Sequence, residues 1–214
     1  MLIRTVVAPL LATNCHLVVD GDLVWVVDPG AGAADQVDAV VRDGRLAVAG
    51  ILLTHGHLDH TWDAAELSDR HEVPVHVHAD DAYRLADPLG SLGPTGAAIA
   101  AMAGQHAGPP APARLETFLS AVPAPVTVLH SPGHTEGSTV YLLDDDAGPV
   151  ALTGDVLFAG SVGRTDFPGG DPDLMATSLA RLATLDPRTR VLSGHGPAST
   201  IGTELARNPY LRNV

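Results

Sequence analysis

Four side chains that can bind metal ions lie within one short segment, residues 54–60, which has the sequence T-H-G-H-L-D-H. They are His55, His57, Asp59 and His60. Imidazole and carboxylate groups are good ligands for borderline divalent cations. The segment offers more donors than one four-coordinate ion takes from one loop, so it predicts two ions. The alternative is a polar helix start, but four adjacent donors would be hard to satisfy together without a cation.

Further donors stand in three later turns, each of which contains glycine and follows an apolar run. His134 lies in S-P-G-H-T, Asp155 in L-T-G-D, and His195 in S-G-H-G. Side chains at the ends of separate strands can converge at one mouth of a sheet. Each turn alone is a weak signal, because a lone histidine in a turn is commonly solvated. Together with residues 54–60, the turns predict one shared metal site.

Apolar runs that suit strands alternate with fewer stretches that suit helices, which is typical of an α/β fold. The runs expected as strands are residues 3–7, 16–19, 23–27, 50–53, 73–77, 125–129, 139–143, 150–152 and 191–192. The expected helices cover residues 33–43, 60–70, 79–86, 172–185 and 199–206. Residues 87–113 are rich in Gly, Pro and Ala, and are expected either to cover the site or to connect two elements.

Length and composition predict one enzyme domain, residues 1–214, because 214 residues that are 45% hydrophobic can bury a large core. The formal net charge of −13 argues against a nucleic-acid partner, which would require clustered basic residues. No apolar run is long enough to span a bilayer, and the N-terminus lacks the features of a signal peptide, so no membrane partner is expected. With a single cysteine, these features predict a cytoplasmic protein.

The motifs resemble those of the metallo-β-lactamase superfamily along nearly the whole chain. They are V-D-P-G at 27–30, the T-H-G-H-L-D-H segment, S-P-G-H-T-E-G-S at 131–138, T-G-D-V-L-F at 153–158 and G-H-G-P at 194–197. The resemblance implies an αβ/βα four-layer sandwich, in which two mixed sheets pack face to face with helices outside. Pattern alone predicts only an α/β protein.

The resemblance also implies a ligand set for two divalent metal ions. One ion would be held by His55, His57 and His134, the other by Asp59, His60 and His195, and Asp155 would bridge them. Asp59 would in addition act in catalysis by orienting the attacking water, and Asp28 would hydrogen-bond the ligand loop from behind. Zinc is the first choice of metal, and iron and manganese suit the same mixed nitrogen and oxygen donors.

Two later stretches are similar to the small glyoxalase II-type (hydroxyacylglutathione hydrolase-like) members of the superfamily. They are G-S-V-G-R-T-D-F at 160–167 and the ending from G-H-G-P to N-P-Y-L at 208–211. This resemblance implies a thioesterase that cleaves small S-(2-hydroxyacyl) thiols. Arg164 matches a basic residue that binds the carboxylate of the thiol, although a surface salt bridge explains it equally well. Asp155 stands where many zinc β-lactamases have Cys, which argues against an antibiotic hydrolase.

Several alternatives remain at this point. A persulfide dioxygenase would use a mononuclear iron site at His55, His134 and Asp155, and the G-H-G-P motif disfavours it. Hydrolysis of another small ester or lactone is a second alternative, and a non-enzymatic scaffold, which would have lost ligands, is a third. The sequence leaves open the thiol, the acyl group and the oligomeric state. His76 and His78 share a strand face, where a polar strand end is favoured over a further metal site, and His130 has no donor neighbours at ligand spacing.

Overall fold

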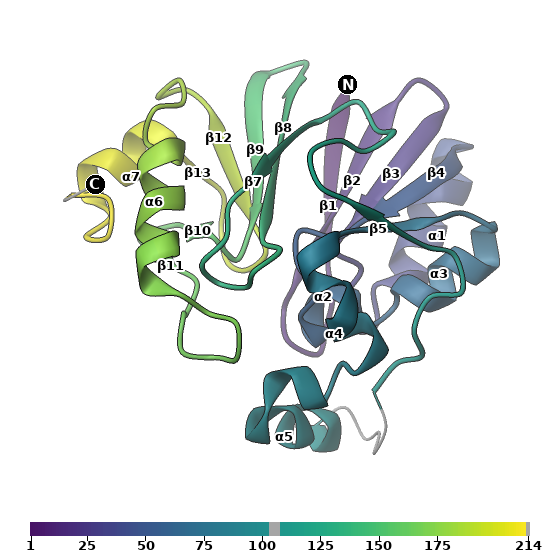
Figure 1. Ribbon diagram of the computed structural model, residues 1–214. Coiled ribbons are helices and arrows are strands. Elements are labelled where there is room, and N and C mark those ends of the chain that lie inside the picture. The colour runs from purple at the N-terminus through teal and green to yellow at the C-terminus, as the bar shows by residue number, and fades with distance from the viewer. Residues whose placement is uncertain (103–107, 213–214) are drawn as a thin grey trace.

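A computed structural model of the chain describes residues 1–102 and 108–212. Two β-sheets pack face to face, with helices on the outer side of each, as Figure 1 shows. Helices α1 (Ala34–Gly44) and α3 (Ala64–His71) cover one sheet, while α6 (Pro172–Leu182) and α7 (Ile201–Arg207) cover the other. The predicted four-layer αβ/βα sandwich is therefore confirmed. Within the described residues, no helix is both long enough and apolar enough to cross a membrane.

The first sheet has the strand order β1-β2-β3-β4-β5-β6. Its strands are β1 (Leu2–Val7), β2 (Asn14–Asp20), β3 (Leu23–Val27), β4 (Ala47–Leu52), β5 (Val75–His78) and β6 (Leu115–Phe118). The first three strands pair antiparallel, and those from β3 to β6 pair parallel. Because the parallel strands end at the same edge of the sheet, the loops that follow β4 and β5 lie close together.

The second sheet has the order β13-β12-β9-β8-β7. Its strands are β7 (Thr127–His130), β8 (Thr139–Asp145), β9 (Gly148–Gly154), β12 (Arg190–Ser193) and β13 (Ser199–Thr200). β9 and β12 are parallel, and α6 connects them, so both strands end at one edge of this sheet. A separate short hairpin, β10 (Leu157–Phe158) and β11 (Ser161–Val162), follows β9.

Three clusters of buried apolar side chains fill the spaces between the layers. The cluster between the sheets includes Trp25, Leu52, Tyr141 and Leu152, which come from facing strands of both sheets. A second cluster joins the first sheet to α1 and α3, and a third joins the second sheet to α6 and α7. Burial of this apolar surface stabilises the sandwich and fixes the position of the loops at its end.

The expected helix over residues 60–70 is interrupted. α2 (Leu58–Thr61) ends before α3 begins, because the backbone N–H of Asp63 bonds the carbonyl of Pro29 at 2.9 Å instead of continuing the helix. The Asp63 carboxylate accepts bonds from the N–H groups of Gly32 and Ala34. Local sequence could not predict this contact, because it joins segments that are distant along the chain.

Residues 87–113 contain two elements that the sequence did not predict, η2 (Gly90–Leu92) and α5 (Pro94–Met102). Helix α5 consists largely of small apolar residues and lacks an amphipathic period. Residues 103–107, which belong to the same expected cover or connection, lie outside the described residues. Strand β6 was also missed, since its short L-E-T-F sequence exposes two of four residues. The remaining elements, η1 (Ala79–Asp81) and α4 (Ala82–Ala86), match the expected helix at 79–86.

Candidate metal centre

The structure brings all seven predicted metal ligands together at one end of the sandwich. Residues 54–60 follow β4, the turn that carries His134 follows β7, Asp155 follows β9, and His195 follows β12. Both sheets thus contribute ligands to the same place. One possible ligand atom from each member of three groups lies within 4.8 Å of the others, and the groups are His55–His57–His134, His55–His60–Asp155 and Asp59–His60–His195.

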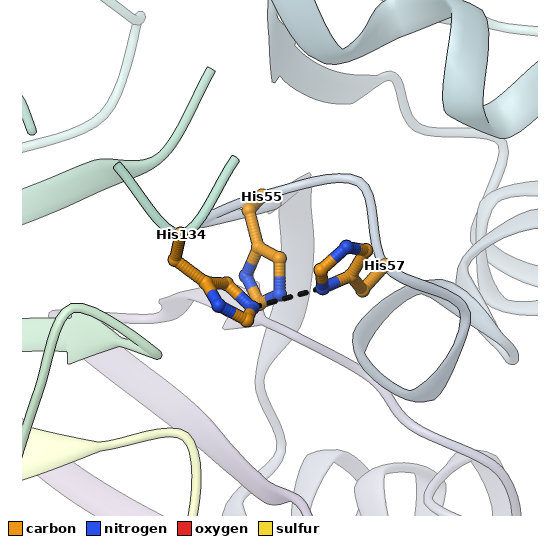
Figure 2. Close-up of side chains that lie close together, drawn as sticks. All are labelled: His55, His57 and His134. Carbon is orange, nitrogen blue, oxygen red and sulfur yellow. Dashed lines mark hydrogen bonds between the residues drawn. The ribbon is translucent and has the colours of Figure 1, made fainter. Parts of the chain in front are cut away.

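The first group consists of three imidazole rings that face one point, as Figure 2 shows. Nδ1 of His57 and Nε2 of His134 are 2.9 Å apart. The ring of His55 has its centroid 4.8 Å from each of the other two rings, in edge-to-face orientations. His55 and His57 come from the loop after β4, whereas His134 comes from the second sheet. Three nitrogen donors that converge in this way can hold one borderline divalent ion.

Asp59, His60 and His195 form the second group, which lies beside the first and contains one carboxylate. Nε2 of His195 is 3.2 Å from Oδ2 of Asp59 and 3.3 Å from Nε2 of His60. Asp155 stands between the groups: its Oδ1 is 3.2 Å from Nε2 of His60, and its Oδ2 is 3.7 Å from Nε2 of His134. A carboxylate in this position is within reach of ions held by either group.

Hydrogen bonds at the far side of three rings set which nitrogen faces the centre. Nδ1 of His134 donates to the carbonyl of Arg164 at 2.7 Å, and Nδ1 of His60 donates to the Asp28 carboxylate at 3.0 Å. Nδ1 of His55 lies 3.1 Å from the Thr54 hydroxyl, which itself donates to Asp28. In the neutral form each of these rings would carry its one proton on Nδ1, so Nε2 would present a lone pair to a bound ion.

The donor set fits a pair of cations. Among the described residues, Nε2 of His55 and Oδ1 of Asp155 are buried and have no hydrogen-bond partner. Unpartnered buried polar atoms are costly in a protein interior, and a bound cation would satisfy both. Gly194 has no side chain and so leaves room for Asp155 and His60. A Cβ at this position would lie 2.5 Å from Oδ1 of Asp155 and would overlap the His60 ring.

The electrostatic environment keeps most of the candidate ligands in their binding forms. His60 and His195 differ: burial lowers the pKa of each ring, but the neighbouring carboxylates outweigh it and raise the pKa, so a cation would replace a proton there. Burial lowers the pKa of His55 and of His57 well below the usual range of histidine, so both rings are neutral near pH 7. Burial alone would raise the pKa of Asp59 and Asp155, but the surrounding histidines, His60 first among them, together outweigh it and lower the pKa of both carboxyls. Neutral imidazole and ionised carboxylate are the forms that bind cations.

Asp28 lies behind the loop of residues 54–60 and hydrogen-bonds it. Its carboxylate accepts bonds from the N–H of Thr54 at 2.8 Å, from the Thr54 hydroxyl at 2.6 Å and from Nδ1 of His60. The residue is 1% exposed and has a φ of 55°, in the left-handed region that Asp and Asn tolerate best among non-glycine residues. Asp28 therefore orients His60 directly and His55 through the Thr54 hydroxyl.

Asp28→Asn should weaken metal binding roughly 10- to 100-fold, because it removes the charge that orients His60 while keeping the backbone conformation. Competition with a chelator measures this affinity. Asp63→Asn is the matched control, since Asp63 is also a buried carboxylate that accepts two backbone N–H bonds, but it contacts no ligand. If the two variants lost metal to the chelator equally, the role of Asp28 would reduce to general stability.

Two further supports were missed by the sequence analysis. Asp81 is fully buried and accepts bonds from the N–H of Gly56, the hydroxyl of Thr135 and the N–H of Gly137, at 2.7–2.9 Å. It thus ties the loop after β4 to the loop that carries His134. The side-chain amide of Asn14 donates to the carbonyls at positions 193 and 196, on both sides of His195. Neither residue has ligand spacing, and the sequence assigned neither of them a supporting role.

A cavity of about 450 Å³ opens directly onto the centre. Its polar wall contains five of the candidate ligands, His57, Asp59, His134, Asp155 and His195. Its other wall is mainly apolar and includes Leu11, Leu92, Phe158 and Phe167. Leu92 and Thr95 belong to residues 87–113, so the described part of this segment contributes to the wall of the site. The cavity can hold a small molecule with an apolar part against the metal ligands.

Arg164 lies at the edge of this cavity. Its guanidinium forms two bonds to Asp166, at 2.6 and 2.7 Å, and lies over the ring of Phe167 at 3.7 Å from the ring centroid. The side chain is 53% exposed. The structure therefore contains the salt bridge that was the simpler alternative for Arg164, and also places this residue beside the site.

Curated relatives match this chain nearly from end to end. An uncharacterized protein of Mycobacterium leprae is 38% identical over 100% of both chains. Probable metallo-hydrolase YqgX of Bacillus subtilis is 34% identical and covers 97% of this chain and 96% of its own. Hydroxyacylglutathione hydrolase GloC of Haemophilus influenzae is 31% identical and covers 94% of this chain and 93% of its own.

Solved structures and a family model agree with these relatives. BLEG-1 B3 metallo-beta-lactamase has a TM-score of 0.84 at 32% identity and covers 98% of this chain and 99% of its own. TTHA1623, solved in a di-iron-bound form, has a TM-score of 0.83 at 34% identity and covers 97% of this chain and 100% of its own. The model of the metallo-beta-lactamase superfamily matches residues 8–195. This chain belongs to the metallo-beta-lactamase superfamily.

Proposed function

We propose that the protein is a dinuclear metal-dependent hydrolase that cleaves a small thioester, such as an S-(2-hydroxyacyl) thiol. The observation that carries this proposal is the position of Asp155 between two groups of ligands at the mouth of one cavity. A relative described as a hydroxyacylglutathione hydrolase supports the substrate class. Zinc is the metal we expect first, and the di-iron form of TTHA1623 supports iron as the other candidate.

His55, His57 and His134 would hold one ion, Asp59, His60 and His195 the other, and Asp155 would contact both. Divalent cations in such a pair would lower the pKa of bound water towards neutrality, and would polarise the carbonyl of a substrate.

The residues of the chain position the reactants. Asp59 is 19% exposed in its side chain and lines the cavity, where its carboxylate can accept a hydrogen bond from the attacking water. The apolar wall that contains Leu92 and Phe167 would pack against the acyl group and exclude bulk water from the carbonyl. A thiolate is a good leaving group, so the reaction needs little help from a general acid, and no such residue has to be assigned.

Arg164→Ala should raise KM roughly tenfold with metal content and kcat almost unchanged, if the guanidinium binds an anionic group of the substrate. Steady-state kinetics on the metal-loaded protein measure both constants. Arg188→Ala is the matched control, because Arg188 forms the same two-residue pair with Asp186 at an exposed site away from the cavity. An unaltered KM for Arg164→Ala would assign Arg164 to the salt bridge alone.

Substrate class is tested on one preparation of known metal content with three compounds: a lactoyl thioester, a persulfide and a chromogenic cephalosporin. We expect hydrolysis of a lactoyl thioester and no oxygen consumption with a persulfide. One iron per chain with oxygen consumption would replace the proposal by a persulfide dioxygenase.

Hydrolysis of a β-lactam is the second candidate function, favoured by the structural similarity to BLEG-1. A chromogenic cephalosporin in the third assay separates it from thioester hydrolysis. Faster turnover of the cephalosporin than of the thioester would overturn the thioesterase assignment while leaving the metal centre intact.

A further inference from the structure

Arg84 has one of the largest fully buried side chains among the described residues. It lies in α4, and it is neither a candidate metal ligand nor part of the cavity wall. A buried charge is costly unless it is paired and hydrogen-bonded. The partners of its guanidinium therefore explain why the residue lies there.

The stem of the Arg84 side chain lies against the loop that carries His55 and His57. Its Nε donates to Oδ1 of Asp81 at 3.2 Å, and the same carboxylate accepts the backbone N–H of Gly56. A Cβ at Gly56 would lie 2.8 Å from Cβ and 2.9 Å from Cδ of Arg84. The stem therefore packs directly on the backbone between two candidate ligands.

The far end of the side chain reaches a different loop, residues 164–170, which lies between β11 and α6. Nη2 donates to the carbonyl of Pro168 at 2.9 Å and to the Glu136 carboxylate. Among the described residues, hydrogen bonds from outside this loop reach it only at the carbonyls of Arg164 and Pro168. Pro168 is exposed, so the bond from Arg84 anchors the middle of a surface loop.

The same loop forms part of the cavity wall through Phe167, which directly precedes Pro168. The Phe167 ring lies edge-to-face with the ring of His57, with 5.9 Å between the centroids. Its other contact is the guanidinium of Arg164, 3.7 Å from the ring centroid. A shift of Pro168 would therefore move both Phe167 and Arg164 relative to the candidate ligands.

We propose that Arg84 is a positioning residue for the substrate, because it joins the ligand loop at Gly56 to the cavity wall at Pro168. A planar guanidinium can donate in two directions at once, here to Asp81 through Nε and to Pro168 through Nη2. The ammonium of lysine is a single point charge and cannot replace both bonds. The role rests on the proposed function only for the choice of substrate.

Gly169→Ala tests this anchor while leaving Arg84 and every candidate ligand in place. A Cβ at Gly169 would overlap the Glu136 carboxylate and Nη2 of Arg84, so the loop has to move away from them. Hydrogen exchange at the amide of Gly170, which bonds the carbonyl of Phe167, should become roughly tenfold faster or more. KM should rise roughly tenfold, with kcat and metal content almost unchanged.

Gly160→Ala is the matched control. Gly160 has a φ of 76° and Gly169 a φ of 85°, so alanine is strained in the same way at both positions. A Cβ at Gly160 would meet no atom within 4 Å, however. This variant should keep the KM of the wild type and its exchange rate at Gly170.

Arg84→Met keeps a stem against Gly56 but removes every bond of the guanidinium. It should raise KM and speed exchange at Gly170 by factors similar to those of Gly169→Ala. The double variant should be no worse than the more affected single variant, because both changes release the same anchor. Metal content, measured on each sample, separates this effect from loss of the metal centre.

Unchanged exchange at Gly170 in Gly169→Ala, or faster exchange with an unaltered KM, would overturn the proposal even if Arg84→Met fails to fold. Hydrogen exchange needs no substrate, and KM can be measured with whichever of the three compounds is turned over. Lack of thioester turnover would therefore overturn the proposed function and leave the role of Arg84 to be decided by these two measurements.

Discussion

Asp155→Ala should reduce the turnover of a thioester by about a thousandfold or more and should lower metal occupancy at both groups of ligands. The reason is the position of its carboxylate, which lies between the two groups of candidate ligands. Its oxygens are 3.2 Å from Nε2 of His60 and 3.7 Å from Nε2 of His134. Initial rates and metal content of the dialysed protein, measured on the same sample, check both parts of this result.

Asp59→Ala provides the comparison. Asp59 belongs to the second group of ligands only, so its loss should remove about one equivalent of metal and leave the site of His55, His57 and His134 occupied. Equal metal loss in the two variants would mean that Asp155 does not bridge. Full occupancy and activity in Asp155→Ala would contradict the dinuclear assignment altogether.

Asp81→Ala should lower the free energy of unfolding by about 3–5 kcal/mol, which is a large part of the stability of a typical domain. The change leaves two buried N–H groups, those of Gly56 and Gly137, and the hydroxyl of Thr135 without their acceptor. It also removes one of the partners of the fully buried Arg84 guanidinium, which bonds Asp81 at 3.2 Å and keeps its bonds to Glu136 and to the carbonyl of Pro168. Urea denaturation measures the loss.

Asp69→Ala is the control for this change, because Asp69 forms an ion pair with Arg114 at the surface, with 67% of its side chain exposed. Its effect should stay within about 0.5 kcal/mol. Because Asp81 joins the two loops that carry His57 and His134, the Asp81→Ala protein should also retain metal less well. Wild-type stability in this variant would show that the network around Asp81 is not needed to hold the loops together.

The candidate centre was predictable from sequence because its residues are constrained by chemistry. His55, His57, Asp59 and His60 are donors at a spacing that has little other purpose, and the three later ligands stand in glycine-bearing turns after apolar strands. The strands themselves were predictable for the same kind of reason, since most of them are buried and therefore strongly apolar. Resemblance to a known family then supplied the arrangement of the layers.

The features that sequence did not predict depend on contacts between distant segments. Local sequence does not distinguish Asp81 from the other aspartates. Its role depends on Gly56 and Thr135, which the fold brings to its carboxylate. His78 and His130 stack only because strands of two different sheets end side by side. The break between α2 and α3 likewise follows from the bond between Asp63 and Pro29. Local propensity carries no information about such pairs.

The central claim, a centre of two metal ions joined by Asp155, is tested most directly by anomalous diffraction at the absorption edge of the bound metal in crystals of the loaded protein. We predict two anomalous peaks at the end of the sandwich, one among His55, His57 and His134 and one among Asp59, His60 and His195, with the Asp155 carboxylate in contact with both. A single peak at the first group, with Asp59 and His60 free of metal, would contradict it.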